Sequence, residues 1–121
     1  MKFLLYYENK LFINYLKELI KNNNDEFVDL NDDTNICSAY KMYKPNWILI
    51  DLQLKKNNGF DVAELLKSEF PEANIALLSD FRDKRLKVKS NEIGAVLIPK
   101  ENLFNFYNII NSEKNNMQIE R

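Results

Sequence analysis

The chain has 121 residues, a formal net charge of −1, one cysteine and no histidine. Its length suits a single domain, and its balanced charge gives no general attraction to nucleic acid or to an anionic membrane surface. The missing histidines exclude a zinc site of the usual ligand set and a His-based catalytic triad, and no apolar stretch approaches the ~20 residues that span a bilayer. With a single cysteine no internal disulfide is possible, so we expect a cytoplasmic protein.

Apolar runs alternate with segments of helical periodicity along the chain. The first half predicts strands at 2–7, 27–30 and 46–51, with helices at 10–22 and 32–43. The second half predicts helices at 60–69, 82–91 and 102–112, with strands at 74–79 and 95–98. Residues 1–112 would form the domain, and residues 113–121 would be a polar tail.

Two local details of this prediction concern the first and third helices. Asn9 is a plausible N-cap for the first helix. The inward stripe of that helix is predicted to be Phe12, Tyr15, Leu16, Leu19 and Ile20. The third helix is predicted to face the core with Phe60, Val62, Leu65 and Leu66.

Five strands alternating with five helices predict an α/β fold in which a parallel sheet is covered on both faces. Right-handed crossovers leave few topologies, and the strand order 2-1-3-4-5 is common at this size. We therefore expect a flavodoxin-like (βα)5 three-layer sandwich.

In that order the carboxyl ends of four strands surround one crevice, the usual place for chemistry in open α/β sheets. Asp51 ends the apolar run Trp47-Ile48-Leu49-Ile50 and is the strongest single clue. The residues at the four strand ends are Tyr7 and Glu8, Asp51, Ser79, and Pro99 and Lys100. The sequence thus predicts that carboxylates, a hydroxyl group and an amine converge at this edge.

These residues and their order resemble the receiver domain of two-component response regulators over nearly the whole chain. Asp51 is followed by Gly59 at the spacing of the family's turn after its phosphoacceptor. Ser79, Gly94-Ala95 and Lys100 then follow at the family's positions, and the opening Met-Lys-Phe-Leu-Leu is similar to its first strand.

The resemblance implies a stand-alone phosphoacceptor rather than an enzyme acting on other molecules. Asp51 would be the nucleophile that takes a phosphoryl group from a phosphohistidine. Lys100 and Ser79 would contact the phosphoryl oxygens. Glu8, Asp51 and the main-chain carbonyl of Gln53 would bind Mg²⁺, which commonly uses one or two carboxylates together with water and phosphate oxygens.

Four positions depart from the family pattern. Tyr7 stands where the family has the first of two acidic residues, which predicts weaker Mg²⁺ binding. Lys55 replaces a usual proline. Asp80 follows Ser79 where a small residue is usual, and it would either repel a phosphoryl group or cap the next helix. The aromatic switch residue of the last strand is absent, because the candidate positions hold Leu97 or Ile98.

The expected partners are a histidine kinase or phosphotransfer protein and a downstream protein target. The target would dock on the face formed by helix 82–91, strand 95–98 and helix 102–112. Phe104 and Ile109 lie off the core stripe of that last helix and suggest a protein-binding or homodimer face. A basic stripe on helix 82–91 is either a solvated surface or a site for an acidic protein, and it comprises Arg82, Lys84, Arg85, Lys87 and Lys89.

Two alternatives stay open. The chain could be a degenerate receiver that acts as a phosphorylation-independent interaction or dimerisation module. It could also be an unrelated flavodoxin-like domain that binds a small anion, although a Gly-rich phosphate loop is absent from the sequence.

Overall fold

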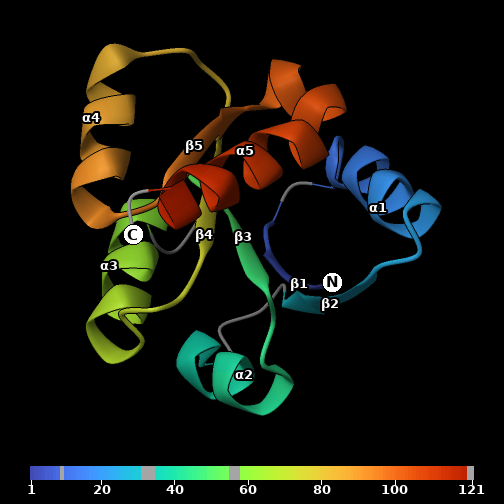
Figure 1. Ribbon diagram of the computed structural model, residues 1–121, viewed down its shortest axis with the longest axis horizontal. Helices are drawn as coiled ribbons and strands as arrows, with labels where there is room; N and C mark the ends of the chain where they lie inside the picture. Colours follow the sequence, from blue (N-terminus) through green and yellow to red (C-terminus); the bar gives the residue numbers. More distant parts are fainter. Residues whose placement is uncertain (9, 31–34, 55–57, 120–121) are drawn as a thin grey trace.

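The computed structural model describes residues 1–8, 10–30, 35–54 and 58–119, and of residues 113–119 it describes the backbone. Five parallel strands form one sheet in the order β2-β1-β3-β4-β5, and helices cover both of its faces (Figure 1). The strands are β1 (Lys2–Tyr6), β2 (Glu26–Leu30), β3 (Trp47–Asp51), β4 (Ile75–Ser79) and β5 (Val96–Pro99). The helices are α1 (Ile13–Asn22), α2 (Ile36–Tyr43), α3 (Gly59–Glu69), α4 (Lys84–Ile93), the short 3₁₀ helix η1 (Lys100–Asn105) and α5 (Phe106–Ile119). The predicted flavodoxin-like fold and strand order are confirmed.

The core has two halves, one on each side of the sheet, because side chains alternate along each strand. Leu4, Ile48 and Ile50 face the side covered by α2, α3 and α4. Phe3 and Leu49 face the other side, which α1 and α5 cover. Strands β3 and β4 are buried at every residue, as a sheet covered on both faces requires.

Several predicted helix boundaries were wrong. Helix α1 begins at Ile13 instead of residue 10, and its predicted cap, Asn9, lies outside the described residues. Helix α5 continues past the predicted end at residue 112 to Ile119, so most of the predicted polar tail is helical. Residues 32–34, predicted to start the second helix, are outside the described part, and α2 begins at Ile36 with Asn35 as its cap.

Two inward-facing residues were also predicted wrongly. Tyr15 is exposed, and Ile13 is buried in its place on α1. Leu65 is exposed, and Ala63 takes the buried position on α3. In both helices the buried residues recur at spacings of three and four, so an apolar residue beside that stripe stays in solvent.

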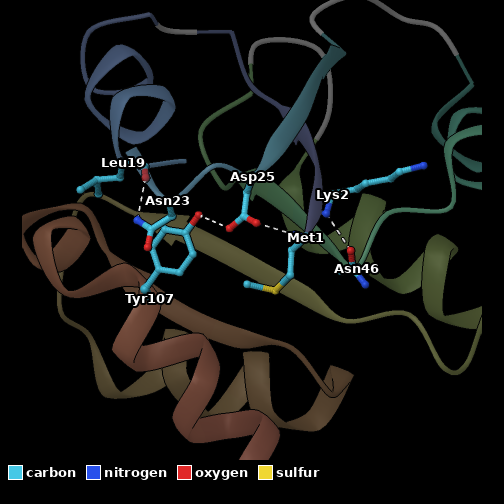
Figure 2. Close-up of polar contacts among 7 residues, drawn as sticks. All are labelled: Met1, Lys2, Leu19, Asn23, Asp25, Asn46 and Tyr107. Carbon is cyan, nitrogen blue, oxygen red and sulfur yellow. Dashed lines mark hydrogen bonds and ion pairs between the residues drawn. The ribbon is translucent and has the colours of Figure 1, made fainter. Parts of the chain in front are cut away.

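A polar cluster joins α5 to the amino-terminal edge of the sheet (Figure 2). The carboxylate of Asp25, just before β2, accepts hydrogen bonds from the Met1 ammonium group and from the Tyr107 hydroxyl group, the latter at 2.7 Å. The Tyr107 ring packs edge-on against Phe3 and Phe106. One side chain therefore links α5 to both β1 and the start of β2, at the edge opposite Asp51.

Candidate functional site

Asp51 is the last residue of β3 and is 1% exposed. Its main chain pairs with β4, and the amide of the following residue, Leu52, donates to the Leu78 carbonyl at 2.9 Å. The chain then turns, and the Gln53 amide donates to Asp51 Oδ1 at 2.9 Å. The carboxylate is thus fixed at a strand end by main-chain contacts on both sides.

Gly59, the first residue of α3, allows this turn to pack tightly. A Cβ atom at Gly59 would lie 2.8 Å from the Asp51 carbonyl oxygen and 2.8 Å from Leu52 Cα. Both are backbone atoms, which cannot move aside as a flexible side chain could. The Asp51–Gly59 spacing in the sequence therefore has a physical cause, because the start of α3 rests directly on the Asp51 turn.

Lys100 follows β5 and brings its ammonium group to the Asp51 carboxylate. Its Nζ atom lies 3.1 Å from Asp51 Oδ2, and its side chain is only 10% exposed. This contact is an ion pair without hydrogen-bond alignment, so Oδ2 is buried with no hydrogen bond among the described residues. The Phe12 ring, with its centroid 3.9 Å from Nζ, covers the ammonium group further.

Burial raises the pKa of Asp51 above its usual value, although the Gln53 amide and the Lys100 ammonium group oppose that shift. Desolvation disfavours the charged carboxylate more than these two partners stabilise it. A perturbed acid beside a buried cation at a strand end is typical of functional sites. The predicted convergence of Asp51 and Lys100 is confirmed.

Ser79 is buried at the end of β4, next to Pro99 in the register of the sheet. Its hydroxyl group donates to the Phe81 carbonyl oxygen at 2.8 Å, so it folds the loop after β4 back on itself. The structure brings Ser79 to the predicted edge of the sheet. Its predicted contact with a phosphoryl oxygen stays a prediction.

The hydroxyl group of Tyr7, the residue after β1, is held by α1. It accepts a hydrogen bond from Lys17 Nζ on α1 at 2.8 Å, and the same ammonium group contacts Asp29 Oδ2 on β2 at 2.6 Å. Burial alone would lower the pKa of Lys17, but the hydrogen bonds to Asp29 and Tyr7 outweigh burial and raise it. Tyr7 is thus part of a polar contact between α1 and β2.

The predicted metal ligands lie at the same edge. Glu8 is half-buried after β1, and Gln53 lies two residues after Asp51 in the turn that follows β3. Within the described residues, no three acidic, histidine or cysteine side chains gather into a group that could hold a metal ion. The predicted set, the Glu8 and Asp51 carboxylates with the Gln53 carbonyl, consists of oxygen donors, the donor type that Mg²⁺ prefers.

Asp80 does not cap α4, which corrects one of the two interpretations of this residue. The cap is Asp83, whose Oδ1 accepts from the Arg85 amide at 2.8 Å. Asp80 instead places Oδ1 2.6 Å from Lys100 Nζ. Sequence reasoning missed this second carboxylate on the lysine, and only the position of Asp80 next to Ser79 could have suggested it. Lys55, the other unusual position after Asp51, lies outside the described residues.

A hollow of about 520 Å³ lies between the loop after β4, α4, β5 and α5, and Arg82, Lys84, Lys87, Leu97 and Ile109 are among its lining residues. Phe104 is exposed on the adjoining η1, and Phe81 is exposed on the loop after β4. This face joins basic side chains to apolar ones. No helix in the described part of the chain is long and apolar enough to cross a membrane.

Comparison with solved structures places the fold among receiver domains. A response regulator receiver domain from Methanospirillum hungatei superposes with a TM-score of 0.81 at 16% identity, covering 99% of this chain and 98% of that one. The signal receiver domain of a repressor protein from Vibrio parahaemolyticus also gives a TM-score of 0.81 at 16% identity, covering 98% and 93%.

A response regulator from Burkholderia pseudomallei, solved with a phosphorylated aspartic acid and a calcium ion, gives a TM-score of 0.79 at 19% identity, covering 98% of this chain and 71% of that one. No protein-family model matches the sequence, and no curated protein is significantly similar to it. At these identities the comparison establishes the receiver-domain fold.

Proposed function

We propose that this chain is a receiver domain that accepts a phosphoryl group on Asp51 from a phosphohistidine and signals by docking another protein. The observation that carries the proposal is the buried Asp51 carboxylate with Lys100 Nζ 3.1 Å from Oδ2, at the carboxyl end of a parallel sheet. Its chemistry agrees with that of the Burkholderia relative, whose aspartic acid is phosphorylated.

In the proposed reaction, a carboxylate oxygen of Asp51 forms a bond to phosphorus as the P–N bond of the phosphohistidine breaks. The donor's imidazole ring keeps the electron pair of that bond and takes up a proton. The product is an acyl phosphate on Asp51. Such transfer depends mainly on positioning and charge neutralisation, so the protein's contribution is to hold its groups in place.

Lys100 supplies the positive charge for a phosphoryl oxygen, since its ammonium group already lies in the pocket and is shielded from water by Phe12. Ser79 is the candidate hydroxyl donor, after release of its hydrogen bond to Phe81. Glu8, Asp51 and the Gln53 carbonyl would hold Mg²⁺, which would supply charge neutralisation at the phosphoryl group. The absent acid at Tyr7 predicts weak binding of that ion.

The proposed partners are a histidine kinase or phosphotransfer protein as donor and a protein target for the face around the 520 Å³ hollow. Arg82, Lys84 and Lys87 on that hollow favour an acidic surface on the target. β5 carries Leu97 and Ile98 in place of an aromatic switch residue.

The test is the intact mass of the protein after incubation with Mg²⁺ and acetyl phosphate. We expect a gain of one phosphoryl group that Asp51→Asn abolishes, that Lys100→Met strongly reduces, and that Asp61→Asn, an exposed acid on α3, leaves unchanged. Mass is preferable to tryptophan fluorescence, because Trp47 begins β3 at the end opposite Asp51. A gain that survives Asp51→Asn would refute the proposal.

A second function, a phosphorylation-independent interaction module, is favoured by one observation. Lys100 already has a close carboxylate partner in Asp80, so its ammonium group is paired without a phosphoryl group. Complete absence of a mass gain, with the protein folded and Mg²⁺ present, would make this the better proposal.

A further inference from the structure

The Lys100 ammonium group lies between two carboxylates, and the closer one is not the proposed phosphoacceptor. Its Nζ atom is 2.6 Å from Asp80 Oδ1 and 3.1 Å from Asp51 Oδ2. The lysine side chain is 10% exposed, whereas the Asp80 side chain is 32% exposed and reaches in from the rim. The contact with Asp80 is thus an ion pair between a buried ammonium group and a carboxylate that is partly exposed.

The loop that carries Asp80 is held against the segment that carries Lys100. Ser79 turns the loop through its hydrogen bond to the Phe81 carbonyl oxygen. Further along, Arg82 contacts Glu101 at 2.6 Å and Asn102 at 3.0 Å, both on η1. Arg82 and Glu101 are mostly exposed, so their ion pair contributes little by itself. Together these contacts fix where Asp80 sits relative to Lys100.

We infer that Asp80 is an internal anion that occupies Lys100 in the unphosphorylated protein and thereby slows phosphoryl acceptance at Asp51. The inference rests on the function proposed above and names a residue that lowers the rate of its phosphoryl transfer. A phosphoryl group brings negative charge into a pocket where two carboxylates already share one ammonium group. It must draw Lys100 away from Asp80 and also approach the Asp80 charge, and both effects oppose transfer.

The structure separates this role from a merely structural one. The cap of α4 is Asp83, so removing Asp80 leaves the helix start intact. Asp80 lies at the protein surface, and Asn has nearly the same shape as Asp without the charge. Asp80→Asn should therefore fold normally while releasing Lys100.

The experiment measures the rate of mass gain with acetyl phosphate and Mg²⁺ for wild type, Asp80→Asn, Asp80→Ser and Asp80→Glu. We expect both neutral variants to react at least tenfold faster than wild type, which corresponds to about 1.4 kcal/mol. Asp80→Glu, which keeps the charge, should stay within a few-fold of wild type. Glu101→Gln is the matched control. It removes the acid that pairs with Arg82 between the loop after β4 and η1, without touching Lys100, and it should leave the rate unchanged.

The outcomes distinguish this inference from the proposed function. If wild type gains the mass of a phosphoryl group but Asp80→Asn and Asp80→Ser gain it no faster, the inference is overturned and the proposed function stands. A gain seen only in the neutral Asp80 variants, and lost again when Lys100→Met is added, would support the inference while showing that the natural chain is not phosphorylated. No gain in any variant would overturn both, and acceleration by Glu101→Gln as large as by Asp80→Asn would assign the effect to loop release instead.

Discussion

Replacing Tyr107 with phenylalanine removes one hydroxyl group from the cluster at the amino-terminal edge of the sheet (Figure 2). The ring can stay in place, because it packs against Phe3 and Phe106 through its carbon atoms. What is lost is the 2.7 Å hydrogen bond to the Asp25 carboxylate. Hydrogen bonds to charged groups contribute roughly 1.5–3 kcal/mol, and since Tyr107 is only half-buried we expect the free energy of unfolding to fall by about 1.5–2 kcal/mol.

The effect should depend on pH in a defined direction. Burial alone would raise the pKa of Asp25, but hydrogen bonds from the Met1 ammonium group and Tyr107 outweigh it and hold that pKa below its usual value. A lowered pKa in the folded state stabilises the protein above the unfolded pKa of about 3.9, and this stabilisation is lost as the pH falls through the folded pKa. Burial, reinforced by Asp25, raises the pKa of Tyr107 well above its usual value, so its contribution is present below about pH 10 and lost above.

Urea unfolding at several pH values measures this prediction, with the exposed Tyr15→Phe as the matched control. The deficit of Tyr107→Phe should be constant near neutral pH and shrink under acid conditions, and Tyr15→Phe should match wild type within about 0.5 kcal/mol. A double-mutant cycle with Asp25→Asn should show that the two changes are not additive. If Tyr107→Phe is as stable as wild type at pH 7, or if its deficit is the same at pH 3, the reasoning fails.

Three further predictions test the packing of the turn after β3, the N-cap of α4 and the burial of the Asp51 carboxylate. Gly59→Ala places a Cβ atom 2.8 Å from two backbone atoms and should lower the free energy of unfolding, measured in urea, by about 1–3 kcal/mol. Glu64→Ala on the same helix is the control and should be nearly neutral. Equal effects of the two changes would contradict the close packing at Gly59. Asp83→Ala should lower the amide-exchange protection of the first turn of α4 by removing its cap, whereas Asp80→Ala should not; the reverse result would restore Asp80 as the cap. Because burial raises the pKa of Asp51, the folded state disfavours its charge, and stability falls as the pH rises through the interval between the unfolded and folded pKa. Asp51→Asn should therefore be more stable than wild type at pH 7, with the difference vanishing below about pH 3.9; a less stable variant at pH 7 would refute this.

Within the candidate site, features carried by one position and its spacing were predictable. Asp51 ends a continuous apolar run, so its place at a strand end followed from the pattern alone. Gly59 could be recognised by its spacing from Asp51, and the structure supplies the reason, since a side chain there would strike the backbone of the turn. Lys100 beside Asp51 followed once the strand order was predicted.

Contacts and buried positions for which several side chains compete were not predictable. Asp80 was expected either to repel a phosphoryl group or to cap the helix predicted at 82–91. The helix begins at Lys84, so only Asp83 is in position, and Asp80 is left to pair with Lys100. Tyr15 and Leu65 were assigned to the core because they are apolar, whereas the helix phase buries Ile13 and Ala63 instead.

The sequence by itself determined the order of strands and helices, the two-sided burial of β3 and β4, and the residues that end each strand. These follow from hydrophobic period and chain connectivity, which are local properties. The tertiary structure alone decided that Tyr7 turns toward Lys17, that Ser79 bonds to Phe81, and that Lys100 is shared by two acids. Those choices are competitions between charges and hydrogen-bond partners brought together from distant parts of the chain, and their outcome depends on distances of a few ångströms that no spacing in sequence encodes.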